Sequence, residues 1–332
     1  MQDRVFIAVA DSPFPSLGPA RQVLRELNPE IQLAAQATPE GIVALARNAD
    51  ALMVTYAKIT AEMIAEMPKV KIISRMGLGV DNIDVPAATR AGIVVTRVAE
   101  YCTEEVSDHA MALLLALIRK VAIGNQAVQS GRWQMPVVVP IHRIRGTTLG
   151  LLGFGKIPHF VAPRAQAFGM NVIAYDPFAP NEVFSRLGVE RVDLETLFAT
   201  SDYVSIHCPL TADTRHLVNA AAFSKMKAGV YLVNTARGPI IDEQALAAAL
   251  DSGRVAGAAL DVMEKEPPGD SILLGRSNVL IQPHTGFYSE ESLVELETKA
   301  AQEVYRVLTG RPPLNPLNPE VLAATGESVA AK

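Results

Sequence analysis

The chain has 332 residues and a net charge of −5, with 49% hydrophobic and 20% charged residues, which is typical of a globular protein of about two domains. This charge argues against a nucleic-acid partner, and the longest apolar stretch, residues 110–118, is too short to span a bilayer. The N-terminal segment has no signal-peptide pattern, and Cys102 and Cys208 predict neither a disulfide framework nor a metal site. We therefore expect a cytoplasmic protein that binds no membrane, nucleic acid or metal.

The first hundred residues alternate between short apolar runs and helical patterns. The strand-like runs are residues 5–10, 31–34, 51–55 and 71–74, and the helical patterns are 17–27, 39–46 and 61–67. Such alternation predicts an α/β unit built on a parallel sheet. The loop that follows contains Gly77 and Gly79, which would let backbone amides turn towards an anion, although a plain glycine-rich turn explains the same residues.

A long helical pattern begins at Thr103. We expect Thr103 to be its N-cap, followed by Glu104 and Glu105 in the first turn, and the apolar residues continue to about Val128. Residues 133–145 are expected to form a surface connection after this single helix.

A dinucleotide-binding pattern occupies residues 149–176. An apolar strand leads through Gly153 and Gly155 into a helix that ends near Phe168, and a second strand ends in Asp176. The first glycine permits a tight turn, and the second lets the backbone approach a pyrophosphate at the helix N-terminus. Asp176 follows Gly153 by 23 positions, near the spacing at which a carboxylate bonds the adenosine ribose and disfavours a 2′-phosphate. The two glycines alone would fit an ordinary strand-to-helix turn, but the added acid favours an NAD site.

Two prolines depart from this pattern. Pro158 stands where the third glycine of the fingerprint belongs, but the first helical turn tolerates proline because its amides have no intrahelical partner. Pro163 lies further in, where we expect a lost hydrogen bond or a kink.

Further βα repeats continue to about residue 284, and a final helix follows. The strand-like runs are 203–207, 229–234, 256–260 and 279–281, and the helical patterns are 242–250 and 290–308.

Polar side chains follow three of these strands, where open α/β sheets bind ligands. Arg237 can hold a carboxylate by two bonds, and His284 belongs to the residue type most easily used as proton donor and acceptor near neutral pH. Asp261 and Glu266 follow the intervening strand, and Glu266 could orient the histidine. Taken alone, the arginine also fits a surface position in a turn and the histidine a structural role, so the combination of residues carries the prediction.

The motifs resemble, in order, those of the D-isomer-specific 2-hydroxyacid dehydrogenases. The resemblance covers nearly the whole chain, is sharpest from about residue 72 to 284, and extends to the branch that includes the C-terminal-binding-protein corepressors. Besides the dinucleotide pattern, the matching motifs are residues 77–84, 104–109, 207–211, 234–238, 259–262 and 283–286.

The resemblance implies an NAD-dependent enzyme that interconverts a small D-2-hydroxy acid and its 2-oxo acid, of the phosphoglycerate or hydroxypyruvate/glyoxylate type. Arg237, Glu266 and His284 would be the catalytic residues: Arg237 would bind and polarise the 2-oxo acid, and Glu266 would orient His284, the proton donor. The amides of Leu78 and Gly79 would hold the substrate carboxylate together with Arg237.

The resemblance also implies which residues contact NAD. Lys156 and Ile157 would offer amides to the pyrophosphate, and Asp176 would bind the ribose. The full implied set is Gly153, Gly155, Lys156, Ile157, Asp176, His207, Cys208, Thr235, Ala236, Arg237, Asp261, His284 and Gly286.

The implied architecture has two domains. A Rossmann-type doubly wound nucleotide domain would span residues 101–286, and a smaller flavodoxin-like α/β substrate domain would combine residues 1–100 with 287–332. The helix that begins near Thr103 would lie at the hinge and at a homodimer contact.

Alternatives remain open at the level of function. An NADH-sensing, corepressor-like binding protein on the same scaffold would bind the cofactor without turnover, and a phosphite dehydrogenase would share the site. Formate enzymes pair glutamine with histidine, so Glu266 argues against that activity. Lys58 follows a strand of the substrate domain and either selects a second anionic group or is a solvated lysine.

Overall fold

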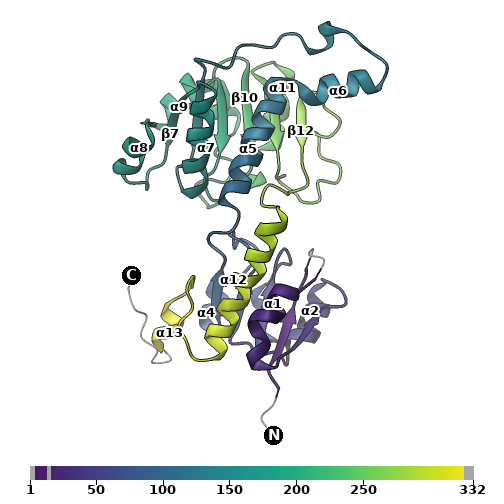
Figure 1. Ribbon diagram of the computed structural model, residues 1–332, viewed down its shortest axis with the longest axis vertical. Coiled ribbons are helices and arrows are strands. Elements are labelled where there is room, and N and C mark those ends of the chain that lie inside the picture. The colour runs from purple at the N-terminus through teal and green to yellow at the C-terminus, as the bar shows by residue number, and fades with distance from the viewer. Residues whose placement is uncertain (1–3, 13–15, 325–332) are drawn as a thin grey trace. The chain divides into compact units, whose positions relative to one another are not determined.

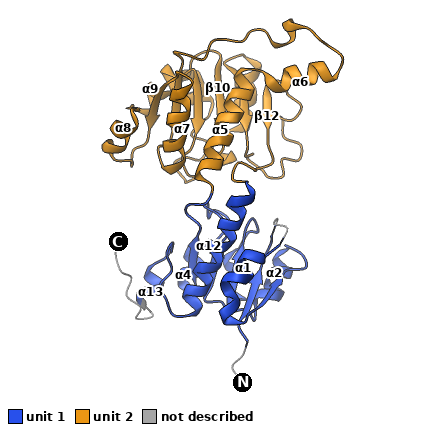
Figure 2. Cartoon of the chain, viewed as in Figure 1, with its two compact units in different colours: residues 1–101, 289–332 blue, residues 102–288 orange. Residues whose placement is uncertain are grey.

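A computed structural model describes residues 4–12 and 16–324, which form two compact units (Figure 1). Unit 1 comprises Met1–Tyr101 and Ser289–Lys332, and unit 2 comprises Cys102–Tyr288 (Figure 2). These divisions fall one residue beyond the first boundary expected from the sequence and two residues beyond the second. Unit 1 is therefore assembled from two separate stretches of the chain.

Unit 1 is built on a five-stranded parallel sheet of strand order β2-β1-β3-β4-β5, which is the flavodoxin-like order. Helices α2, α3 and α4 pack on one face, while α1, α12 and α13 pack on the other. The strands are β1 (Phe6–Val9), β2 (Glu30–Leu33), β3 (Ala51–Val54), β4 (Ile72–Arg75) and β5 (Val94–Arg97). The helices are α1 (Gly18–Leu24), the 3-10 turn η1 (Arg25–Leu27), α2 (Pro39–Ala46), α3 (Ala61–Ala65), α4 (Val85–Arg90), α12 (Glu290–Leu308) and α13 (Glu320–Ala324).

Unit 2 is built on a seven-stranded parallel sheet of order β12-β11-β10-β9-β6-β7-β8. Starting from β8, its first six strands follow the doubly wound dinucleotide-binding order, in which the direction of winding reverses between β6 and β9. The strands are β6 (Thr148–Leu152), β7 (Asn171–Tyr175), β8 (Glu190–Arg191), β9 (Tyr203–Ile206), β10 (Val230–Asn234), β11 (Val255–Leu260) and β12 (Val279–Ile281).

The helices of unit 2 cover both faces of its sheet. Helices α5, α7 and α8 pack on one face and α9, α10 and α11 on the other. The helices are α5 (Thr103–Ile118), α6 (Val121–Gln129), η2 (Met135–Val138), α7 (Lys156–Ala167), α8 (Asn181–Leu187), α9 (Leu194–Thr200), α10 (Ala220–Lys225), η3 (Gly238–Ile240) and α11 (Glu243–Asp251).

The predicted single helix from Thr103 to about Val128 is wrong. Lys120 adopts a left-handed conformation with φ of 54°, and the chain bends by 60° between α5 and α6. The N-cap is Cys102 rather than Thr103, which is already helical. The apolar pattern continues across the break and therefore does not mark it, because α6 keeps an apolar face although little of it is buried.

We find no single helix in the described part of the chain that is long and apolar enough to cross a membrane. Helices α5 and α6 meet the length and composition required only when they are taken together, despite their bend.

Candidate active site

The two glycines of the dinucleotide pattern play different roles after β6. Gly153 has φ of 95°, and a Cβ there would lie 2.6 Å from the Cys208 nitrogen and 2.9 Å from the His207 carbonyl carbon. Gly155 is the N-cap of α7, and a Cβ there would have no atom within 4 Å. Gly153 thus permits close packing of two loops, whereas Gly155 borders open space at a helix N-terminus without a side-chain cap, as a bound pyrophosphate requires.

The two prolines are accommodated differently in α7. Pro158 is the third residue of the helix, where the missing amide hydrogen has no intrahelical partner to lose. Pro163 lies inside α7, where it removes one amide donor, and the helix nevertheless continues to Ala167. The amides of Gly155, Lys156 and Ile157 remain as first-turn donors.

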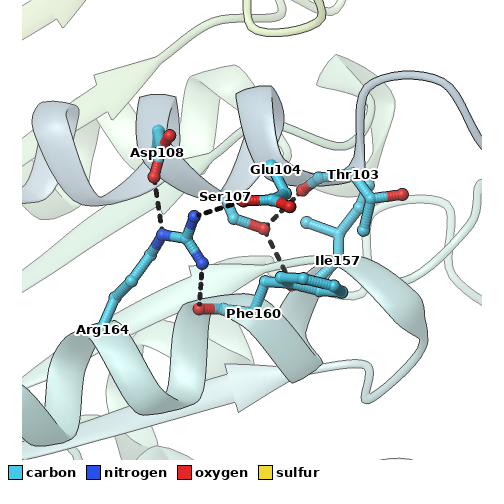
Figure 3. Close-up of polar contacts among 7 residues, drawn as sticks. All are labelled: Thr103, Glu104, Ser107, Asp108, Ile157, Phe160 and Arg164. Atoms are coloured by element: carbon cyan, nitrogen blue, oxygen red, sulfur yellow. Dashed lines mark hydrogen bonds and ion pairs between the residues drawn. The ribbon is translucent and has the colours of Figure 1, made fainter.

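Helix α7 is fixed by polar contacts to the N-terminal part of α5 (Figure 3). The Arg164 guanidinium contacts Asp108 at 2.6 Å and Glu104 at 3.4 Å. The buried Ser107 hydroxyl lies 3.0 Å from the Ile157 carbonyl oxygen, its acceptor in the first turn of α7. These contacts hold the first turn, whose amides are the candidates for anion binding, in a fixed place within unit 2.

Asp176 lies next to the glycine turn, as the spacing predicted. Its Oδ2 accepts a hydrogen bond from the Phe154 amide at 2.8 Å, and its Oδ1 accepts bonds from the amides of Phe178 and Ala179 at 2.8 and 3.0 Å. A carboxylate offers about four acceptor positions, so this half-buried group retains about one for a hydroxyl donor.

The loop after β9 brings two uncharged titratable side chains to the same edge of the sheet. Burial lowers the pKa of His207 to about 4, and its Nε2 lies 2.8 Å from the Ser205 hydroxyl. Burial raises the pKa of the Cys208 thiol to about 11. Both side chains are therefore neutral at pH 7, and beside Gly153 they add no charge to the glycine turn.

The loop after β10 presents Arg237 and packs tightly on the loop after β11. A Cβ at Gly238 would lie 1.9 Å from the carbonyl carbon and oxygen of Met263, so no side chain fits there. The Asn234 side chain bonds the Arg237 carbonyl at 2.8 Å and accepts the Ala236 amide at 3.0 Å, which fixes residues 235–237. This packing places Arg237 close enough to Glu266 for its charge to lower the pKa of that carboxyl.

Glu266 and His284 form a hydrogen-bonded pair. Oε2 of Glu266 lies 2.7 Å from Nδ1 of His284, and Oε1 accepts the Met263 amide at 3.0 Å. Burial alone would raise the pKa of Glu266, but the bond to His284, the Met263 amide and the Arg237 charge together hold it below its usual value. A carboxylate on Nδ1 selects the tautomer and orients Nε2, the other ring nitrogen, for chemistry.

Asp261 lies at the end of β11 and is paired with a residue that the sequence analysis did not single out. The carboxylate accepts the amides of Thr285 and Gly286, each at 2.8 Å, and His109 from α5 lies 3.3 Å away through Nε2. Burial would raise the pKa of Asp261, but His109 and the two amides hold it below its usual value. The only sequence signal for His109 was its place in the motif 104–109.

Leu78 and Gly79 belong to unit 1, in the loop at the carboxyl end of β4. The Arg75 guanidinium lies beneath this loop, where Nη1 would be 1.0 Å from a Cβ at Gly77. Further along the same loop, the Asn82 side-chain amide donates to the carbonyls of Thr55 and Ala57, in the neighbouring loop after β3, at 3.2 and 3.0 Å. Lys58, which comes next, is exposed.

No group of three or more histidine, cysteine, aspartate or glutamate side chains among the described residues is arranged to hold a metal ion.

Comparison with known proteins gives consistent matches. Residues 111–286 match the family model described as D-isomer specific 2-hydroxyacid dehydrogenase, NAD binding domain. A D-3-phosphoglycerate dehydrogenase of Synechocystis is 41% identical over 270 residues, which cover 81% of this chain and 49% of the relative. The chain thus spans about half the length of that curated relative.

Other relatives match along more of their length. A hydroxypyruvate reductase of Thermotoga maritima is 43% identical over 263 residues, which cover 78% of this chain and 85% of the relative. The solved structure of a glyoxylate reductase from Paecilomyes thermophila superposes with a TM-score of 0.86 at 30% identity, covering 96% of this chain and 99% of that one.

Proposed function

Because the chain belongs to the D-isomer-specific 2-hydroxyacid dehydrogenase family, we propose that it interconverts a small D-2-hydroxy acid and its 2-oxo acid with NAD as the cofactor. The observation that carries this proposal is the Glu266–His284 pair, whose Oε2 and Nδ1 atoms lie 2.7 Å apart. This acid–base pair lies at the same edge of the sheet as the open glycine turn, because the carboxyl ends of parallel strands share an edge.

His284 acts as the proton donor in the reducing direction and as the proton acceptor in the oxidising direction. Glu266 orients the ring through Nδ1 and stabilises the protonated form, and Arg237 binds the 2-oxo acid and polarises its carbonyl group. NAD, when bound, supplies the hydride acceptor, or the hydride donor in its reduced form. The division of roles gives each of the three residues a separate kinetic signature.

The placement of the glycine turn supports the proposed NAD-binding residues. The first-turn amides of Lys156 and Ile157 hold the pyrophosphate, and Asp176 accepts a ribose hydroxyl through its remaining acceptor position. A 2′-phosphate in place of that hydroxyl would be repelled by the carboxylate, so NADH is preferred over NADPH. The residues lining the rest of the cofactor site in this proposal are His207, Cys208, Thr235, Ala236, Arg237, Asp261, His284 and Gly286.

The substrate class is that of the named relatives, which include phosphoglycerate dehydrogenase, hydroxypyruvate reductase and glyoxylate reductase. In this proposal the amides of Leu78 and Gly79 bind the substrate carboxylate. The buried Arg75 guanidinium beneath their loop supports this role, because a nearby positive charge stabilises a bound anion.

We also infer a homodimer in the cytoplasm, without a nucleic-acid or membrane partner. Helix α6 and the segment after it lie apart from the sheet of unit 2 (Figure 1) and expose large apolar side chains, with Trp133 85% and Met135 72% exposed. Large apolar side chains exposed within one short segment are typical of an interaction site, and a second copy of the chain would cover them.

The test is NADH oxidation against glyoxylate, hydroxypyruvate, phosphohydroxypyruvate and pyruvate, with NADPH in parallel. We expect turnover of at least one acid with NADH preferred, and a loss of about 100-fold or more in kcat for His284→Ala with NADH binding largely retained. Arg237→Ala should reduce both substrate affinity and rate. NADH binding without turnover of any acid would refute the enzyme and favour a nucleotide sensor.

A further inference from the structure

Asp261 fixes the backbone that carries His284. Three consecutive amides, those of His284, Thr285 and Gly286, all donate to this one residue, the first to its carbonyl oxygen and the other two to its carboxylate, each at 2.8 Å. His284 has φ of 57°, a left-handed conformation that is strained for an L-residue. The three bonds to Asp261 therefore offset the strain that the orientation of His284 requires.

The Asp261 carboxylate depends on His109 in turn. Asp261 is 2% exposed, and removing a carboxylate from water is costly unless opposite charge or donors surround it. Apart from the two amides, the close group is Nε2 of His109, 3.3 Å from Oδ1. A Cβ at Gly286 would lie 2.8 Å from Asp261 Oδ2 and 3.2 Å from His109 Cδ2, so the three residues pack without a gap.

His109 is anchored independently of the loop it contacts. It lies on α5, whose apolar face is buried against the sheet of unit 2. Nε2 is buried, and its 3.3 Å contact with Asp261 Oδ1 is not a hydrogen bond of good geometry in this structure. A rigid helix thus presents a histidine to the carboxylate that holds the His284 backbone.

We propose that His109 is a positioning residue for the reaction, holding Asp261 in place and, through Asp261, the backbone of residues 284–286. This inference rests on the proposed dehydrogenase function. Glu266 orients the His284 ring through Nδ1, whereas His109 and Asp261 fix its main chain, so the site has two separate positioning devices. His109 touches neither substrate nor the reacting atoms in this scheme.

The experiment compares His109→Gln, which keeps a donor near the position of Nε2, with His109→Phe, which keeps the ring volume and removes the donor. His142→Gln, at an exposed residue outside the site, is the matched control. For each protein we would measure kcat and KM for the best 2-oxo acid, the pH profile of kcat, and amide hydrogen exchange of residues 284–288 without cofactor.

In His109→Phe we expect kcat to fall about 10-fold or more with KM changed less than about 3-fold, because misplacement of an acid–base group acts on the chemical step. Amides 285 and 286 should exchange about 10-fold faster, while the rest of unit 2 keeps its protection. The titratable groups at this place are His109, Asp261, His284 and Glu266. Loss of the His109 contact should move the acidic limb of the pH profile of kcat to higher pH, because Asp261 then protonates more readily.

His109→Gln should recover most of the rate and protection, and His142→Gln should match the wild type. Wild-type rates, pH profile and exchange in His109→Phe would overturn the inference while leaving the dehydrogenase function intact. A wild-type protein that turns over no 2-oxo acid would refute the proposed function, and the exchange measurement would still decide whether His109 fixes the loop. A third outcome would also overturn the inference. If His109→Phe loses exchange protection throughout the protein without a change in its pH profile, and His109→Gln keeps both protection and wild-type rates, His109 is only a packing residue.

Discussion

Replacement of Gly153 and Gly155 by alanine separates folding from cofactor binding within one short motif. At Gly153, an alanine would meet two penalties. Its φ of 95° lies in the region that L-residues rarely adopt, which costs about 1–2 kcal/mol, and its Cβ would lie 2.6 Å from backbone that must shift, which costs about 1–3 kcal/mol. We therefore expect Gly153→Ala to lower the free energy of unfolding by about 2–5 kcal/mol.

Gly155→Ala is the matched control. The added methyl group would have no atom within 4 Å, and the residue already has an ordinary negative φ of −84°. Its free energy of unfolding should stay within about 1 kcal/mol of wild type. The methyl group would instead occupy the space proposed for the pyrophosphate, so NADH affinity should fall about 10-fold or more.

The two measurements are urea unfolding followed by circular dichroism and NADH titration followed by fluorescence. Wild-type stability in Gly153→Ala would refute the reasoning about close packing between the loops after β6 and β9. Wild-type NADH affinity in Gly155→Ala would refute the placement of the pyrophosphate at the N-terminus of α7.

Three further predictions concern other parts of the chain. If Lys58 binds a second anionic group of the substrate, Lys58→Ala should raise KM for phosphohydroxypyruvate about 10-fold and leave KM for glyoxylate unchanged. An equal rise in KM for both acids would contradict this role. Trp133→Glu should convert the dimer to a monomer in sedimentation experiments, since a charge on the exposed apolar surface opposes association; a wild-type sedimentation profile would exclude this surface as the contact. Burial raises the pKa of Glu297 in α12, so this carboxyl holds its proton to a higher pH in the folded state than in the unfolded state. The free energy of unfolding therefore falls as the pH rises from the unfolded-state pKa through the raised folded-state pKa. Glu297→Gln should therefore unfold at a higher temperature than wild type above this window, with the difference vanishing near pH 4.5, and an unchanged pH dependence of the melting temperature would contradict it.

Much of the fold was predictable because its signals are local. Strands such as residues 279–281 and helices such as 290–308 were expected with the same limits as β12 and α12, since apolar runs and helical periodicity are complete within each segment. The break at Lys120 was not predictable, because a single left-handed residue leaves no trace in a continuing apolar pattern.

For the candidate site, the sequence pointed to strand ends, and parallel strands bring these ends together. The Glu266–His284 pair was therefore expected as a plausible contact before the 2.7 Å distance was known. His109 was missed because it lies inside a helix, about 150 positions before Asp261, and nothing local distinguishes it from a structural histidine. Contacts between a helix face and a loop depend on packing, which residue spacing does not encode.

The two-part composition of unit 1 has a consequence for the order in which the protein folds during synthesis. The face of its sheet that carries Ile72 is covered by α12, where Leu296 and Ala300 pack, and the Ser74 hydroxyl bonds the Ala300 carbonyl at 3.0 Å. The ribosome makes residues 4–101 first, then all of unit 2, and only then α12. Until α12 is made, α1 alone covers part of this apolar face, so the early strands of unit 1 leave the ribosome with the rest of the face exposed, while unit 2 can complete its core as soon as it emerges. Chaperone contacts on the nascent chain should accordingly concentrate on the strands of unit 1 until the last helix is released.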